Sequence, residues 1–165
     1  MIIRYAEKTD AQKFWNLMKA LDQETTFMMY EPDERQEDLR MPQRAVDAAA
    51  EGDDLLIFAE DGEELVGFLS VSRESCRRNR HSAYLVCGVR QKYWNRGIAK
   101  MFFRMLDDWA EEKGVKRVEL VVRKDNYVAR HVYERHGFGY EGEHKMAMLI
   151  DGEYYSEVHM AKLFD

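Results

Sequence analysis

The sequence predicts a mixed α/β or α+β fold, and three observations support this prediction. Strand-like and helical segments follow one another in the order β-α-α-β-β-β-α-β-α-β-β, so strands and helices alternate only in part. Two Asp-Gly pairs, at 61–62 and 151–152, lie between strand-like runs and predict tight hairpins. No repeat, linker or low-complexity tract divides the chain, so we expect residues 1–165 to form one domain.

The first part of the chain predicts one strand and two helices. Residues 1–5 alternate weakly and are expected to form a short strand. Thr9 or Asp10 is suited to capping the first helix. The apolar residues of that helix that follow helical spacing are Phe14, Trp15, Met18 and Leu21. Pro42 fits the first turn of a second helix that ends near Gly52.

The central segment predicts a hairpin, a strand and a long amphipathic helix. The apolar runs 55–60 and 64–72 flank the first Asp-Gly turn, and residues 83–89 form the next strand. Gly114 ends the helix that follows. Its apolar face is expected to comprise Ile98, Met101, Phe102, Met105, Leu106 and Trp109.

The last part predicts a strand, a helix and a second hairpin. Residues 115–123 alternate, with Val118, Leu120 and Val122 on one side. The helix after them is capped by Asp125 or Asn126 and stopped by Gly137. The final strands are expected over 139–150 and 153–164.

Composition and net charge indicate a globular domain and disfavour a nucleic-acid-binding or membrane protein. Of the 165 residues, 45% are hydrophobic and 34% charged, which is typical of a globular domain. The net charge of −6 disfavours sequence-independent binding to nucleic acid. Two cysteines make no disulfide framework, and we find neither a signal peptide nor a membrane-spanning stretch. We therefore expect a cytoplasmic protein that binds neither nucleic acid nor membrane.

A strand that runs directly into an amphipathic helix is the first candidate binding site. The first N–H groups of a helix have no partner within it, and its dipole makes that end electropositive. Gly97 and Ala99 are small enough for a phosphate to approach the backbone, and Arg96 and Lys100 add positive charge. Neither a nucleoside-triphosphate P-loop nor a dinucleotide motif is present. A helix start that binds nothing is the alternative.

The helix after the next strand carries the second candidate site. Asn126, Ala129 and Tyr133 are spaced by three and four residues, so they share one face, and Gly137 follows four residues later. A packing stripe would not favour Asn and Tyr around a small residue. The alternative is that Asn126 is only a cap and Tyr133 only a half-buried aromatic residue.

Together, these two segments resemble the GNAT superfamily of N-acetyltransferases. The helix-opening segment WNRGIA, residues 94–99, is similar to the family pattern R/Q-x-x-G-x-G/A, with Trp94 in place of the usual Arg or Gln. The segment NYVARHVYERHGF, residues 126–138, matches N-x-x-A-x-x-x-Y-x-x-x-G-F at every defined position. The resemblance implies a mostly antiparallel, twisted sheet of about six to seven strands, flanked by helices, with one splayed parallel strand pair.

The resemblance also implies acetyl-CoA as co-substrate, bound where the strands ending near Val89 and Arg123 splay apart. Strand backbone would pair with the pantetheine arm and steady the oxyanion, and the helix start would hold the pyrophosphate. Asn126 would hydrogen-bond the pantetheine, and Ala129 would leave it room. The implied cofactor-binding residues are Cys87, Gly88, Val89, Asn95, Arg96, Gly97, Ile98, Ala99, Lys100, Asn126, Ala129 and Tyr133.

The implied reaction is direct attack of a primary amine on the acetyl group, with Tyr133 as general acid toward the departing thiolate. The general base stays open. Tyr84 and Val121 occupy positions where family members often carry Glu, and the other carboxylates considered are Glu119, Glu24 and Glu31. A nucleophilic role for Cys87 is rejected because no base lies in register with it.

The acidic balance favours a small cationic amine as acceptor. The alternatives are an N-terminal or lysine acetyltransferase acting on peptides, and a non-catalytic acyl-CoA sensor. Residues 27–30 would form either an acceptor wall or part of the core. The basic loop 73–80 is expected to be solvated rather than to reach a cofactor phosphate. The histidines show no metal-ligand spacing, and a homodimer could form through the C-terminal strands.

Overall fold

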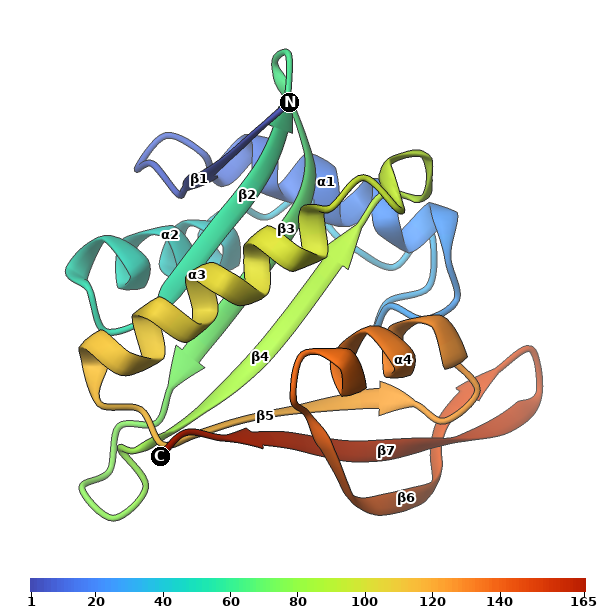
Figure 1. Cartoon of the computed structure of the whole chain (residues 1–165). Helices are drawn as coiled ribbons and strands as arrows, with labels where there is room; N and C mark the ends of the chain where they lie inside the picture. The colour runs from blue at the N-terminus through green and yellow to red at the C-terminus, as the bar shows by residue number, and fades with distance from the viewer.

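The computed structural model describes all residues, 1–165, and contains one seven-stranded sheet in the order β1-β2-β3-β4-β5-β7-β6 (Figure 1). The strands are β1 (Ile2–Tyr5), β2 (Leu55–Asp61), β3 (Glu64–Arg73), β4 (Ser82–Val89), β5 (Arg117–Arg123), β6 (Gly139–Ile150) and β7 (Glu153–Leu163). The helices are α1 (Ala11–Glu24), α2 (Arg40–Glu51), α3 (Ile98–Lys113) and α4 (Tyr127–Arg135), with a short 3₁₀ helix η1 (Gln91–Tyr93). The mixed, mostly antiparallel fold predicted from the sequence is confirmed.

The helices cover the two faces of the sheet unequally. Figure 1 shows α3 and α4 in front of the sheet and α1 and α2 behind it. The core on the α3 side is a cluster of 23 buried residues that includes the inward side chains of β4, β5 and β7. The core behind the sheet is a cluster of eight buried residues from α1, α2, β2 and β3. On the rear face, α1 therefore contacts β4 at Gly88, whereas β5 and β7 have no helix over them.

Only β4 and β5 run parallel, and they pair over a short length. Ser82 to Tyr84 of β4 lie opposite Arg117 to Glu119 of β5, and no pairing continues beyond that point. Both strands extend farther, to Val89 and Arg123, so their carboxyl ends are splayed apart. This separation leaves one edge of β4 without a partner strand.

Local sequence explains the turns and helix ends. Asp151 and Gly152 both have positive φ, 48° and 79°, as a type I′ hairpin turn between β6 and β7 requires. Gly114 ends α3 in the left-handed conformation, as predicted. The second helix begins at Arg40, two residues before Pro42, so this proline lies within the first turn rather than at its start.

The buried face of α3 lacks Met101 of the predicted face and includes Phe103 and Ala110 in addition. Met101 is 43% exposed, whereas Phe103 is buried. Phe103 packs edge-on against Tyr133 and Phe138 and stacks on His136, so α4 and its C-terminal end widen the apolar face of α3 toward that side. The helical period alone does not reveal this second neighbour. None of the helices is both long and apolar enough to cross a lipid bilayer.

Candidate functional site

The unpaired edge of β4 offers backbone hydrogen-bonding groups at the opening between β4 and β5. Arg90 N–H donates to Val66 of β3, and successive residues of a strand point their backbone groups to opposite sides. Gly88 therefore faces β3, opposite Phe68, while Cys87 and Val89 face the opening. Because β5 has separated from β4 there, the groups of Cys87 and Val89 have no strand partner. Such an edge can accept an extended ligand as an added strand.

Cys87 and Tyr133 meet at this edge. The Cys87 Sγ and Tyr133 Oη atoms lie 3.2 Å apart, within hydrogen-bond distance for sulfur. Tyr133 is buried and its ring packs against Phe103 and Phe138, which fixes the direction of the phenol. Burial raises the pKa of Tyr133 well above its usual value. The phenol therefore keeps its proton at neutral pH.

The Cys87 thiol is not an activated nucleophile. Burial raises its pKa, and the hydrogen bond with Tyr133 offsets only part of that rise. No basic side chain contacts the sulfur atom. The rejection of Cys87 as a nucleophile from the sequence agrees with this environment.

The first turn of α4 places the other two residues of the second motif. Asn126 caps the helix, and its Oδ1 accepts a 3.2 Å hydrogen bond from the Ala129 N–H. The amide nitrogen of Asn126 has no partner within the chain, so it can still donate to a ligand. Ala129 is partly buried and packs against the larger core cluster. Asn126 is thus a cap and also holds a free donor.

The loop before α3 presents a run of free amides. The backbone N–H groups of residues 95–100 donate to no acceptor in the chain. Asn95 and Gly97 both have positive φ, 61° and 81°, and the space where a Gly97 side chain would lie is open. Left-handed residues next to a helix start form a concave set of N–H groups that suits an anion. Six unpartnered amides therefore converge at residues 95–100.

Side chains around this loop hold it against the core. Ile98 is buried, so it contributes its amide rather than its side chain to the concave surface. The Arg96 guanidinium lies 5.0 Å from the centre of the Tyr93 ring, and the Tyr93 hydroxyl donates to Asp61 at 2.8 Å. Trp94, where the family pattern has Arg or Gln, donates from Nε1 to the Val89 carbonyl at 2.8 Å. This bond fixes the loop to the end of β4.

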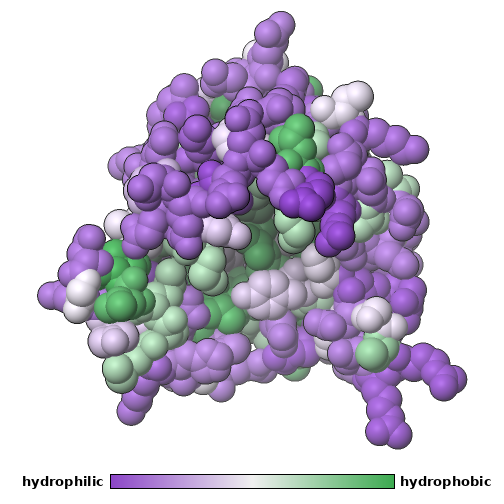
Figure 2. Space-filling view, turned by 180° about the vertical axis from the view of Figure 1, so that it is seen from behind, coloured by the Kyte–Doolittle hydropathy of each residue, from purple (hydrophilic) through white to green (hydrophobic).

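The rear side of the opening carries carboxylates. Strand alternation places Tyr84, Glu119, Glu157 and His159 on the face that α1 and α2 leave uncovered. Burial, together with the Glu157 and Glu119 charges, raises the pKa of Tyr84. Figure 2 shows this rear side, where apolar and weakly polar surface lies below a strongly hydrophilic region. The two β5 arginines are already paired, Arg117 with Glu119 and Glu141, and Arg123 with Asp125.

Sequence reasoning missed Arg123. Its guanidinium is buried, pairs with Asp125, and lies 4.6 Å from the Phe27 ring centre and 4.0 Å from that of Tyr155. It also donates to the carbonyl and hydroxyl oxygens of Thr26, which anchors the segment after α1 beside the opening. The only sequence signal is an arginine directly after the apolar run 120–122. Phe27, the first residue of segment 27–30, is 41% exposed and lies against this arginine, and an acceptor wall formed by that segment stays a prediction.

The carboxylates considered as general bases differ in their surroundings. Glu24 accepts from Arg90 Nε at 2.8 Å and from the Gln91 N–H, so it fastens the end of α1 to the loop after β4. Glu119 accepts from Arg117 Nε at 2.8 Å, and Glu31 is exposed. Glu157 makes no ion pair within the chain and shares the rear face with Tyr84. Glu157 was not among the residues considered from the sequence.

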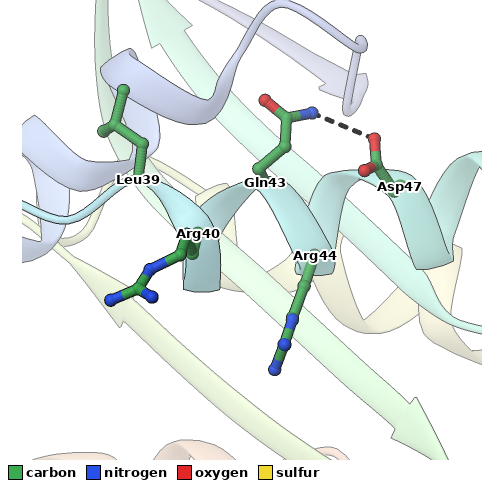
Figure 3. A pocket seen from close by; sticks show the side chains of 5 residues that line it. All are labelled: Leu39, Arg40, Gln43, Arg44 and Asp47. Atoms are coloured by element: carbon green, nitrogen blue, oxygen red, sulfur yellow. Dashed lines mark hydrogen bonds between the residues drawn. The ribbon is translucent and has the colours of Figure 1, made fainter.

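Other parts of the surface lack the features of this site. A hollow of about 430 Å³ lies at the start of α2, but four of its five lining residues belong to that helix. Figure 3 shows Gln43 bonded to Asp47, with the Arg40 and Arg44 side chains extending away from that pair. No group of three His, Cys, Asp or Glu side chains is placed to hold a metal ion. The loop with Arg77 and Arg78 lies at the opposite end of β4 from the free amides (Figure 1).

Comparison with known proteins places this arrangement among acetyltransferases. Residues 14–138 match the model of the acetyltransferase (GNAT) family. The L-amino acid N-acetyltransferase AaaT of Escherichia coli K12 is 35% identical over 112 residues, which are 66% of this chain and 67% of that protein. A GNAT acetyltransferase structure from Streptococcus pneumoniae has a TM-score of 0.91 at 25% identity over 99% of both chains. The structure of yncA, a putative acetyltransferase from Salmonella typhimurium with acetyl-CoA, has a TM-score of 0.86 at 16% identity and covers 100% of this chain and 94% of that one.

Proposed function

The chain belongs to the acetyltransferase (GNAT) family, and from that premise we propose that it transfers an acetyl group from acetyl-CoA to the primary amine of a small molecule, with Tyr133 as general acid. The single observation that carries the proposal is the buried Tyr133 hydroxyl at the unpaired edge of β4, 3.2 Å from Cys87 Sγ. A proton donor is thereby held beside backbone that is free to bind an extended ligand. Metal ions play no part in the proposal.

The residues around the opening fit acetyl-CoA as co-substrate. The free amides of residues 95–100 suit its pyrophosphate, and the backbone groups of Cys87, with the Val89 N–H, suit the pantetheine arm. The free amide nitrogen of Asn126 can donate to the pantetheine, and Ala129 presents only a methyl group beside it. Gly88 lets α1 pack against this strand, because a Cβ there would lie 2.9 Å from Leu21 Cδ1. The acetyl thioester supplies the electrophile.

The residues of the chain perform three functions in the proposed reaction. It orients the thioester through the β4 edge, which makes attack by a bound amine effectively unimolecular. A backbone N–H of that edge, at Cys87 or Val89, stabilises the negative charge that develops on the carbonyl oxygen. Tyr133 donates its proton to the departing sulfur. A lysine-like amine must also lose a proton, at a cost of ~5 kcal/mol at pH 7, and Glu157 or water on the rear face accepts it.

The charge on the rear face favours a cationic acceptor. Glu157 is unpaired there, whereas both arginines of β5 already bind carboxylates. Strand β5 therefore offers no unpaired cationic side chain that could bind a carboxylate group of the acceptor. A second candidate is the α-amine of an amino acid, because the E. coli relative at 35% identity is an L-amino acid N-acetyltransferase. Peptide amines and a sensor without catalysis remain outcomes of the same test.

An acceptor screen tests the function. The purified chain is incubated with acetyl-CoA and one acceptor at a time, and CoA is quantified chromatographically. The acceptors are diamines and polyamines, amino acids, a monoamine with no second charged group, and lysine-containing or free N-terminal peptides. We expect release of CoA with the amines that carry a second positive charge. Release with amino acids alone would assign the second candidate. Tight acetyl-CoA binding without release in any reaction would overturn the proposal in favour of a sensor.

A further inference from the structure

We propose that the Cys87 side chain is a positioning residue for Tyr133: its thiol donates a hydrogen bond to the phenol oxygen and so directs the phenol proton toward the thioester sulfur. This inference rests on the proposed function, in which Tyr133 is the general acid. It assigns to Cys87 a role separate from the backbone contact with the pantetheine arm.

The contact geometry isolates the pair. Cys87 is the only polar partner of the Tyr133 hydroxyl within the chain, at 3.2 Å. The phenol ring packs against Phe103 and Phe138, so the oxygen cannot turn toward another group without disturbing the core. The thiol projects from the strand whose free edge faces the opening. Whatever decides the direction of the phenol proton therefore involves this sulfur atom.

Two hydrogen-bond directions are possible, and they differ in consequence. If the phenol donates to Sγ, its only proton points back at β4 and none is available for the leaving group. If the thiol donates to Oη, the phenol proton is free to point elsewhere. Because burial keeps the thiol protonated at neutral pH, the Cys87 S–H can serve as this donor. Only the second direction suits a general acid.

The same bond supports the proton transfer itself. When the acceptor's nitrogen–carbon bond has formed and the carbon–sulfur bond breaks, the electron pair passes to sulfur and the Tyr133 proton joins it to give a thiol. The phenolate left in this apolar surrounding needs a donor, since an unpaired buried charge is costly. The Cys87 S–H supplies that donor until the phenol regains a proton from water. The proton lost by the acceptor amine leaves to solvent, so the cycle balances.

The test is a double-mutant cycle in steady-state kinetics. Cys87→Ala, Tyr133→Phe and the double variant are compared with the wild-type chain, with chromatographic detection of CoA so that protein thiols do not interfere. We expect Cys87→Ala to lower kcat about tenfold, a fraction of the effect of general acid catalysis, with KM for acetyl-CoA within twofold. In the Tyr133→Phe background, the same substitution should change kcat less than twofold.

Two further variants separate positioning from structure. Cys87→Ser keeps a donor of similar size and is expected to restore kcat to within about threefold of wild type. Cys87→Val fills the site without a donor, with about one methyl group more than Cys, and should resemble Cys87→Ala. Cys76→Ala is the matched control, because Cys76 is an exposed cysteine in the loop between β3 and β4. It should leave kcat unchanged.

The outcomes are distinguishable. If Cys87→Ala lowers kcat by the same factor with and without the Tyr133 hydroxyl, or Cys87→Ser is as slow as Cys87→Ala, the positioning role is wrong while the acetyltransferase function stands. If Cys87→Ala changes only KM, Cys87 contacts the ligand and does not position Tyr133, so the positioning role would again be wrong. A wild-type chain that releases no CoA with any amine would overturn the proposed function, and the inference about Cys87 with it.

Discussion

Arg123, at the end of β5, donates hydrogen bonds of 3.0 and 3.2 Å to the backbone oxygen and the hydroxyl of Thr26, 97 residues earlier in the chain. The contact fastens the segment after α1 to the strand that borders the opening. The remaining guanidinium nitrogens pair with Asp125, and the Phe27 and Tyr155 rings cover the plane. One buried cation thus organises the rear border of the proposed site.

Replacing Arg123 by Met should destabilise the chain. The substitution keeps much of the side-chain volume but removes the bonds to Thr26 and leaves Asp125 without its partner, so we expect a loss of about 2 kcal/mol in the free energy of unfolding, measured in urea. Arg40→Met is the control, because its pairing with Asp38 is exposed and its loss should leave the free energy of unfolding nearly unchanged. Equal losses in both variants would contradict this account.

Replacing Tyr133 by Phe should lower kcat about 100-fold and leave KM for acetyl-CoA within twofold. The ring packing is retained while the acidic proton is lost, and a positioned general acid is worth about 10²-fold or more. The measurement is initial-rate kinetics with the best acceptor from the screen. Tyr127→Phe, in the same helix but 72% exposed, should not change either constant. Undiminished turnover in Tyr133→Phe would remove the acid assignment.

Replacing Gly97 by Val should weaken acetyl-CoA binding about tenfold. Gly97 has φ of 81°, which a β-branched residue adopts only with strain, and the new side chain would project into the open space beside the free amides. Calorimetric titration with CoA gives the dissociation constant. Gly114→Val is the matched control: its φ is 65° with open space beside it, so it should carry similar strain without altering CoA affinity.

Replacing Glu157 by Gln should weaken the binding of cationic acceptors selectively. Without its carboxylate, the rear face loses an unpaired negative charge, so KM for a diamine should rise about fivefold, whereas KM for a monoamine with no second charged group should change less than twofold. Glu153→Gln, at the exposed start of β7, should change neither value. If Glu157→Gln instead lowers kcat for all acceptors alike, Glu157 acts on the proton rather than on acceptor charge.

Acid should weaken the fold through Glu60. Hydrogen bonds from Arg4 and Lys13 lower the pKa of Glu60 to about 2 from an ordinary 4.5. A depressed folded-state pKa stabilises the fold above the unfolded pKa, and this contribution is lost as the pH falls from about 4.5 toward 2. Between pH 6 and pH 2.5, the free energy of unfolding of wild type should therefore fall by about 1–2 kcal/mol more than that of Glu60→Gln. Urea unfolding at each pH measures this difference. The control variant Glu63→Gln should show the same pH dependence as wild type. Parallel curves for wild type and Glu60→Gln would contradict the assignment.

Local patterns were sufficient to predict most of the fold. The helical periods, the Asp-Gly turns and the glycine stops gave the element order, and Asn126 caps α4 as expected. The residues of the proposed site remain predictions about function, but the structure brings Tyr133 to the edge of β4 that carries Cys87.

The remaining features depend on contacts between distant segments. The register of β4 against β3 decides which residues direct their backbone groups into the opening. These residues are Cys87 and Val89 rather than Gly88, and composition does not predict this register. The bond between Trp94 and Val89 depends on the fold of the loop after β4. From the sequence alone, Arg123 is a polar residue at the end of a strand. Its contacts with Thr26 and Tyr155 come from distant parts of the chain and are visible only in the fold.

The close approach of Leu21 to Gly88 lets α1 pack directly on β4. A Cβ at residue 88 would lie 2.9 Å from Leu21 Cδ1, so a larger residue there would push the helix away from the strand. The segment after α1, which Arg123 anchors beside the opening through Thr26, would move with the helix. Kinetic constants for both reactants should consequently change together when residue 88 is enlarged.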